Sequence, residues 1–263
     1  MGIEYYLPHF SLCGLPFPIS LRAAKRAGAD GVEIHLVAKS MLEALRVAMH
    51  ARAMGLGVHW HQGWSLEEDY AKLFLNKALD FFWQLPRSGY LLDGHIPPTD
   101  DPAVIYVERV GEIGPTNNWW VQTACNFEAH PDTALTFERF LKVAEELNLG
   151  IVFDVQHVLE WVLRKDIADL PQNSTFLWTT LEYAWSRLHT RVREIHFTDT
   201  DPRKGSSAGR NVFPGEGILP LADFCAMVRE SRWNGVVVPE VRLSALLRYG
   251  VGGVLEKTRE YFS

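Results

Sequence analysis

The sequence predicts a single domain, residues 1–263, folded as a (β/α)8 TIM barrel. Short apolar runs alternate with helical segments along the chain, which is the pattern of a parallel sheet with crossover helices. The length of 263 residues agrees with the roughly 250 residues that such a barrel needs. No Gly-x-Gly-x-x-Gly sequence follows the first apolar run, so the chain lacks the motif that best indicates a dinucleotide-binding open sheet.

The strands are expected at short apolar runs bounded by glycine, proline or polar residues. In the second and third runs, residues 31–36 and 57–61, a glycine precedes valine and a mixture of apolar and polar residues. The expected strands are residues 3–7, 31–36, 57–61, 90–94, 125–128, 151–154, 195–196 and 236–240.

Capping residues mark several of the helices between these strands. Ser20 is expected to cap the first helix, and Ser65 with Glu68 three residues later matches a capping box. A polar, proline-containing stretch at 170–174 divides the long segment 158–188 into two helices. The expected helices are residues 20–28, 40–55, 66–84, 102–112, 133–148, two within 158–188, 221–232 and 254–262.

The composition excludes several classes of protein. The net charge is −6 and no run of Lys and Arg occurs, so no nucleic-acid partner is expected. The three cysteines are widely spaced, which indicates neither a disulfide framework nor a zinc–cysteine site and suits a reducing cytoplasm. The start lacks a basic signal segment and no apolar run approaches ~18 residues, so we expect a cytoplasmic protein without a membrane partner.

Four residues with metal-ligand chemistry stand at the ends of consecutive expected strands: Glu128, Asp154, His196 and Glu240. In a (β/α)8 barrel these strand ends form one rim, where functional residues gather. Three carboxylates and one imidazole make an oxygen-rich set for one divalent metal ion, Mn²⁺, Mg²⁺ or Co²⁺ before Zn²⁺ or Fe²⁺. Each acid alone could equally cap the following helix. Together they would repel one another, and a bound cation is the simplest way to keep them ionised.

The motifs around these positions are Asp154-Val-Gln-His157, His196-Phe-Thr-Asp199, Pro214-Gly-Glu-Gly217 and Glu240. Together they resemble the signature of the xylose isomerase-like TIM barrels. That superfamily contains sugar isomerases and epimerases, inosose and dehydroshikimate dehydratases, and endonuclease IV. The resemblance covers nearly the whole chain in layout, and its specific motifs lie between about residues 126 and 242.

The resemblance implies that Glu128, Asp154, His196 and Glu240 bind the metal, and that Glu128 and Glu240 also form the acid/base pair beside the substrate carbon. The metal would polarise the carbonyl of a hydroxy-ketone and stabilise its enediolate, and bases on opposite faces would permit inversion. The implied activity is isomerisation or epimerisation of a small carbohydrate: a sugar, sugar phosphate or polyol ketone. A dehydratase is the alternative, since the same enediolate can expel a β-hydroxyl. A barrel that binds a ligand or metal without turnover is a further class.

Further residues of these motifs have two interpretations each. His157 is expected to hydrogen-bond substrate and assist catalysis, with a buried structural histidine as the alternative. Glu216 lies in a glycine-flanked loop that could fold over the site or form a simple turn. Asp199 either orients His196 or stabilises its own loop. Glu33 matches a common acid of the family, and a helix cap explains it equally well.

The third expected strand and the segment after the last one offer substrate contacts. His59 and His61 are two residues apart, so they share one face of the strand, with His61 nearer the mouth. Trp60 is a candidate wall against a sugar ring. Arg242 follows the last strand and could hold a phosphate or carboxylate. Ordinary packing is the alternative for His59, His61 and Trp60, and a solvated side chain for Arg242.

One branch of the superfamily fits poorly. Endonuclease IV carries an Asp-x-His pair before its Gly-Glu-Gly loop, where this chain has Gly209-Arg-Asn211. Those residues cannot supply ligands for a trinuclear zinc site, so a phosphodiesterase is a distant third function. Family members often pair through helices away from the barrel mouth, which leaves a homo-oligomer open. The sequence specifies neither the substrate nor the metal.

Overall fold

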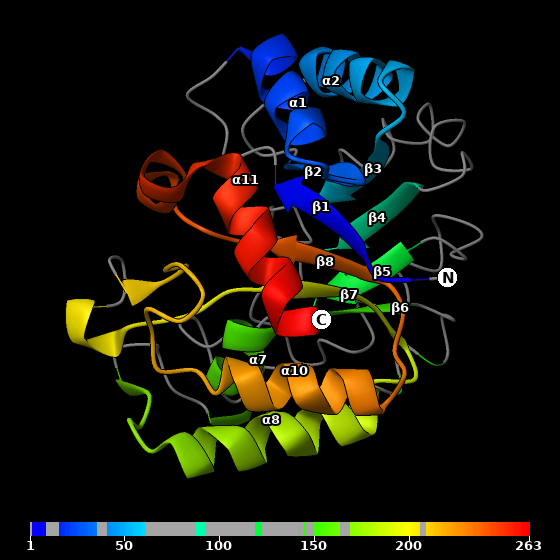
Figure 1. Cartoon of the computed structure of the whole chain (residues 1–263). Coiled ribbons are helices and arrows are strands. Elements are labelled where there is room, and N and C mark those ends of the chain that lie inside the picture. The colour runs from blue at the N-terminus through cyan, green and yellow to red at the C-terminus, as the bar shows by residue number, and fades with distance from the viewer. Residues whose placement is uncertain are drawn as a thin grey trace.

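A computed structural model describes residues 2–8, 16–35, 41–61, 88–92, 119–122, 142, 145, 150–163, 169–205 and 209–263. Its strands form a closed barrel in which the first strand pairs with the last and neighbouring strands run parallel (Figure 1). The predicted (β/α)8 class is therefore confirmed. The strands are β1 (Glu4–Pro8), β2 (Gly31–His35), β3 (Gly57–His61), β4 (Ser88–Leu92), β5 (Trp119–Gln122), β6 (Gly150–Asp154), β7 (Val192–Phe197) and β8 (Val236–Pro239).

The fifth strand begins earlier than expected. β5 occupies Trp119–Gln122 and pairs with β6 through Val121 and Ile151. The run at 125–128 from which this strand was predicted lies outside the described residues. Trp119, Trp120 and Val121 have aromatic and β-branched side chains that favour strands, and that signal was missed.

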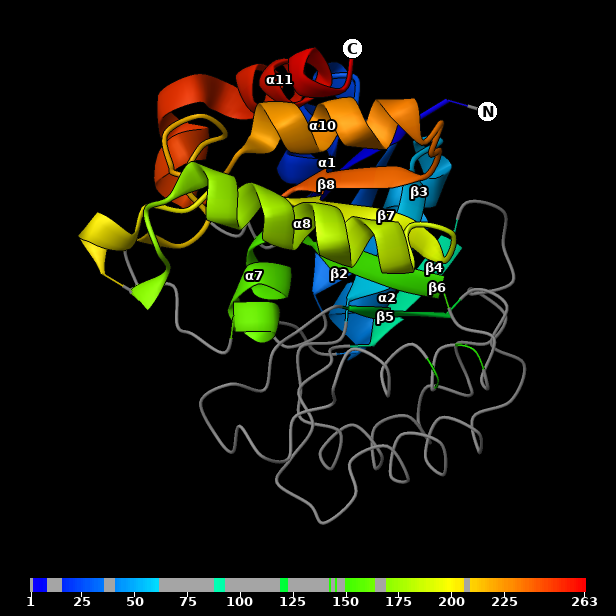
Figure 2. The ribbon, with the colours of Figure 1, turned by 90° about the horizontal axis from the view of Figure 1, so that it is seen from below.

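Helices lie outside the barrel, and the two orthogonal views show α8 (Ser174–Leu188) and α10 (Leu221–Glu230) side by side against it (Figures 1 and 2). Among the described residues, each helix is too short or too polar to serve as a membrane span. The described helices are α1 (Phe17–Arg26), α2 (Met41–Ala53), α7 (Val155–Leu163), α8 (Ser174–Leu188), the short 3₁₀ helix η4 (Pro202–Lys204), α10 (Leu221–Glu230) and α11 (Leu243–Phe262).

The helix boundaries confirm the predicted division of 158–188 and correct the predicted cap of the first helix. The segment 158–188 is indeed divided, because Asn173 caps α8 by accepting a hydrogen bond from the Phe176 N–H at 3.1 Å. Ser20 does not cap the first helix: it lies inside α1, which starts after Pro16, and its hydroxyl donates to the Phe17 carbonyl. Helical structure after β8 starts at Leu243, and the non-helical backbone of Gly250, with φ 70° and ψ 163°, separates it into two segments, the second of which contains the expected helix 254–262.

The strands alternate between two environments. Side chains such as Ile34, Phe153 and Phe197 belong to the buried core that includes residues of the surrounding helices. Tyr6 and Val238 belong to a separate apolar cluster with Val236, which alternation places inside the barrel. Alternation also turns Glu33, His59, Glu194 and His196 inward, and all four are buried. The interior of the barrel is therefore strongly polar toward the strand ends.

Gly31 is required by the packing of Tyr6 inside the barrel. A Cβ at residue 31 would overlap the Tyr6 ring, which is fully buried. Gly31→Ala is expected to destabilise the fold by about 1–3 kcal/mol, the usual cost of overpacking. Gly252→Ala is the matched control, since a Cβ at residue 252 would meet nothing within 4 Å. Chemical denaturation of both variants measures the difference, and equal free energies of unfolding would contradict this packing account.

Candidate metal centre

Adjacent strands bring three of the predicted ligands to one end of the barrel. Asp154 is the last residue of β6 and is the register partner of His196 on β7. Glu240 directly follows β8, and its N–H donates to the Phe197 carbonyl at 3.1 Å. The strand-end pattern seen in the sequence thus places Asp154, His196 and Glu240 together.

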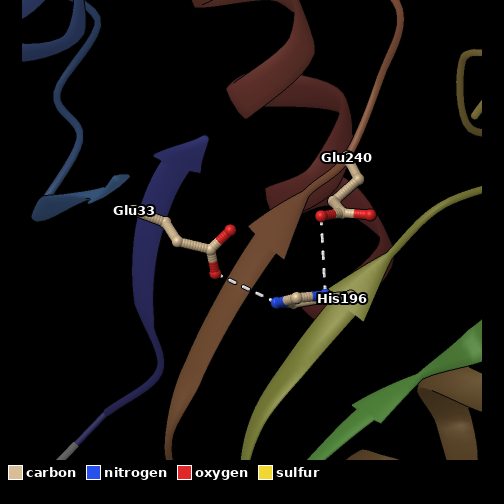
Figure 3. A group of neighbouring side chains, drawn as sticks. All are labelled: Glu33, His196 and Glu240. Carbon is tan, nitrogen blue, oxygen red and sulfur yellow. Dashed lines mark hydrogen bonds and ion pairs between the residues drawn. The ribbon is translucent and has the colours of Figure 1, made fainter. Parts of the chain in front are cut away.

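His196 is the centre of this group, and each of its ring nitrogens faces two carboxylates. Nδ1 lies 3.7 Å from Asp154 Oδ2 and 3.5 Å from Glu240 Oε1. Nε2 lies 3.0 Å from Glu33 Oε2 and 3.2 Å from Glu194 Oε1. Figure 3 shows Glu33 and Glu240 approaching the imidazole from opposite nitrogens. Ionised carboxylates only accept hydrogen bonds, so Nε2 carries the hydrogen that it donates.

Negative charge exceeds positive charge around this ring. Among the described residues, four carboxylates contact His196, and the most exposed of them, Glu240, is 7% exposed. Burial alone would lower the pKa of His196, but the charges of Glu240 and Glu33 outweigh it and hold that pKa well above its usual value. Even with the nearby His157, whose pKa is raised to about 9, two imidazolium charges do not balance four buried carboxylates, so the geometry favours a bound cation.

The donor set fits a divalent metal ion. Glu33, His196 and Glu240 each offer one ligand atom, and these atoms lie within 4.8 Å of one another. The two nitrogens of one imidazole point in diverging directions, so a single ion contacts only one of them. On the Nδ1 side the available donors are the Asp154 and Glu240 carboxylates. Glu128, the fourth predicted ligand, lies outside the described residues.

Asp154 has a second contact that supports the helix-cap alternative as well. Its Oδ1 accepts a hydrogen bond from the His157 N–H at 2.7 Å in the first turn of α7, while Oδ2 faces His196. Burial acts to raise the pKa of Asp154, but His157 and His196 together keep it below its ordinary value. The same side chain can therefore cap a helix and present a charged oxygen to a metal.

His157 is partly exposed, in contrast to His196. Its Nδ1 donates to Glu160 Oε2 at 2.7 Å. Burial lowers the pKa of His157, but the negative charges of Asp154, Glu160 and Glu240 raise it to about 9. The ring is therefore a cation in neutral solution in the described structure, and it lies in the field of the Asp154 and Glu240 carboxylates.

Among the described residues, Asp199 stabilises a loop rather than contacting His196. Its carboxylate accepts hydrogen bonds from the backbone N–H groups of Thr200, Gly215, Gly217 and Leu219, at 2.8–3.1 Å. A Cβ at Gly217 would overlap the Asp199 carboxylate, so glycine is needed there. The structure supports the loop-stabilising alternative for Asp199.

Among the described residues, a cavity of about 240 Å³ lies beside Asn211, and the four carboxylates that contact His196 are not part of its lining. Its lining includes the predicted substrate contacts Glu216 and Arg242 together with Asn211. Asn211 Nδ2 donates to Glu240 Oε2 at 3.4 Å, which connects the cavity to the site. Glu216 itself accepts from Arg248 Nη1 at 3.1 Å and from the Tyr249 hydroxyl.

The other predicted site residues lie on β2 and β3. The backbone positions of Trp60 and His61 lie on β3, but their side chains lie outside the described residues. Glu33 accepts a hydrogen bond from His196 Nε2 at 3.0 Å, and residues 36–40, which a helix cap would serve, lie outside the described residues. Glu194 was missed altogether. Its only sequence signal was its place two residues before His196, on the same face of β7.

Comparisons with solved structures agree with the fold. A D-tagatose 3-epimerase-like protein is 16% identical, with a TM-score of 0.64, covering 98% of this chain and 97% of that chain. A D-allulose 3-epimerase from Methylomonas sp. in complex with D-allulose is 14% identical, with a TM-score of 0.62 and coverage of 99% and 97%. The IOLI protein with a binding zinc atom is 14% identical, with a TM-score of 0.64 and coverage of 99% and 98%. At such identities the similarity establishes the fold alone.

Sequence comparisons give a family. No curated protein matches the chain in a direct search. The sequence profile of the xylose isomerase-like TIM barrels matches residues 112–257, which include Asp154, His196 and Glu240. This match spans more than half of the sequence and agrees with the motifs and with the closed parallel barrel. The chain therefore belongs to the xylose isomerase-like TIM barrel family.

Proposed function

We propose that this protein is a divalent-metal-dependent isomerase or epimerase of a small sugar, sugar phosphate or polyol ketone. The observation that carries the proposal is the convergence of buried carboxylates on His196 at one end of the barrel. A D-allulose 3-epimerase and an L-ribulose 3-epimerase among the structural neighbours, together with the D-tagatose 3-epimerase-like protein, support the choice of reaction. Together, site chemistry and fold favour proton transfer on a hydroxy-ketone.

In this proposal Asp154, His196 through Nδ1, and Glu240 hold the ion, with Glu128 as a further ligand. A bound divalent ion would supply Lewis-acid polarisation of a substrate carbonyl. The carboxylate-rich donors suit Mn²⁺, Mg²⁺ or Co²⁺, while one imidazole also admits Zn²⁺ or Fe²⁺. The zinc atom bound by the IOLI protein is compatible with this range.

Glu240 is the proposed base among the described residues. Its Oε1 faces His196, whereas Oε2 accepts a hydrogen bond from Asn211 at 3.4 Å, which fixes the carboxylate plane. Glu128 would act from the opposite side of the substrate carbon. His157, positively charged at neutral pH, would donate a hydrogen bond to a substrate oxygen on which negative charge develops.

The cavity beside Asn211 is the proposed place for the part of the substrate remote from the reacting carbon. Arg242 and Lys204 line it, so it could receive a phosphate as well as hydroxyl groups. Glu216 would contact hydroxyl groups there. Trp60 and His61 remain proposed contacts on the β3 side of the barrel.

Solvent-proton exchange tests this function. The protein is stripped of metal, reloaded with Mn²⁺ or Co²⁺, and incubated in deuterated water with D-allulose, other ketoses and their phosphates. Nuclear magnetic resonance should show metal-dependent deuterium incorporation beside the carbonyl and a second epimer or isomer. The comparison of neutral with phosphorylated ketoses, repeated with Arg242→Gln, identifies the preferred class. Absence of exchange with every metal and ketose would reject the proposal, and loss of water with new ultraviolet absorbance would replace it by a dehydratase.

A further inference from the structure

Glu194 is an unusual residue for the interior of this barrel. It is fully buried on β7, two residues before His196. Its register partners on the neighbouring strands are Val152 of β6 and Val236 of β8, both buried. The neighbours of Glu194 at the same level of the barrel are therefore apolar, and an apolar side chain would fit this position better than a carboxylate. A carboxylate is costly there unless hydrogen bonds compensate for its lost hydration.

Two imidazoles provide those hydrogen bonds. Glu194 Oε1 accepts from His196 Nε2 at 3.2 Å, and Glu194 Oε2 accepts from Nδ1 of His59. His59 is 2% exposed, and its ring centroid lies 4.4 Å from that of Tyr6. Because Tyr6 packs against His59, the Glu194 carboxylate is held between two fixed rings. Turning away from His196 would break both hydrogen bonds.

The direction of these contacts decides which nitrogen of His196 faces the site. Nε2 faces Glu33 and Glu194 and donates toward them, so in the neutral ring that binds a metal the lone pair is on Nδ1, on the side of Asp154 and Glu240. Metal-binding histidines commonly donate their other ring N–H to a carboxylate, which fixes ring orientation and increases ligand basicity. Glu194 and Glu33 meet this description from beneath the proposed metal site.

We propose that Glu194, held in place by His59, is a positioning residue that fixes His196 with Nδ1 directed at the metal. This inference rests on the proposed function, because it assigns a role toward the ion that Asp154, His196 and Glu240 would hold. It adds a buried layer of the site, Tyr6–His59–Glu194–His196, that no sequence motif indicated.

The test is metal affinity in a near-isosteric variant. Glu194→Gln keeps the shape of the side chain but removes its charge, and calorimetric titration of the metal-free protein with Mn²⁺ or Co²⁺ should show affinity reduced about 10- to 100-fold. The visible absorption spectrum of the Co²⁺ form should also change, because the geometry of the imidazole ligand changes. Glu230→Gln, on the exposed surface of α10, is the control and should leave both unchanged.

A second pair of variants covers a folding failure of Glu194→Gln. His59→Asn retains a hydrogen-bond donor near the position of Nδ1, whereas His59→Leu removes it. His59→Leu should therefore weaken Co²⁺ binding and alter the spectrum of the Co²⁺ form. In His59→Asn, both the affinity and the spectrum should be closer to those of the wild type. Wild-type affinity and spectrum in Glu194→Gln or His59→Leu would overturn this inference alone. Failure of the wild-type protein to bind any divalent ion would overturn the proposed function with it.

Discussion

Glu240→Gln is expected to lower metal-dependent proton exchange by about 10²- to 10⁴-fold, the usual contribution of a positioned general base. Glutamine can still contact Asn211 but cannot accept the substrate proton, so saturation with metal should not restore activity. The partner variant is Asp154→Asn. Asparagine is as good a helix N-cap as aspartate, so α7 should keep its cap while the metal loses a charged ligand.

The two variants should therefore differ in their response to metal. Asp154→Asn should bind the ion more weakly and regain part of its activity at high metal concentration, whereas Glu240→Gln should stay inactive. Exchange rates measured across a metal titration give both results, with Glu256→Gln on the exposed face of α11 as the control. Full activity of either variant at wild-type metal concentrations would remove that residue from the proposed site.

Asp199→Ala should destabilise the protein by at least about 3 kcal/mol, because each buried N–H left without an acceptor costs about 1–3 kcal/mol. The lost acceptor serves Thr200, Gly215, Gly217 and Leu219, which form the loop between β7 and α10. Urea denaturation measures the change in the free energy of unfolding.

Asp199→Asn separates the effect of hydrogen bonding from that of volume. Asparagine retains one acceptor oxygen and nearly the same size, so its free energy of unfolding should fall between those of wild type and Asp199→Ala. Metal affinity should follow stability in both variants, since Asp199 shows no direct contact with His196 among the described residues. Unchanged stability in Asp199→Ala would show that water replaces these hydrogen bonds without cost.

The barrel and part of its site were predictable because both follow from the alternation of strands and helices along the chain. Apolar runs separated by helical segments predict parallel strands, and parallel strands deliver their last residues to one rim. This reasoning located Asp154, His196 and Glu240, and the structure places the Asp154 and Glu240 carboxylates beside the His196 imidazole. Their role in holding a metal, the ligand role of Glu128, and a single domain over residues 1–263 stay predictions.

The buried layer below the site was not predictable in the same way. Glu194 lies in the middle of β7, where strand periodicity indicates only which face it shares, not what lies across the barrel. Its partner His59 is 135 residues away in sequence, and Glu33 is 163 residues from His196. Such pairs depend on how the barrel closes, so one sequence read locally gives no signal for them.

A crystal structure of the protein soaked with Mn²⁺, with anomalous diffraction collected near the manganese edge, tests the central claim most directly. The expected result is one strong anomalous peak per chain, within bonding distance of His196 Nδ1 and of carboxylate oxygens from Asp154 and Glu240. No peak near His196 at saturating Mn²⁺, or an ion bound at a place that these three side chains do not reach, would contradict it.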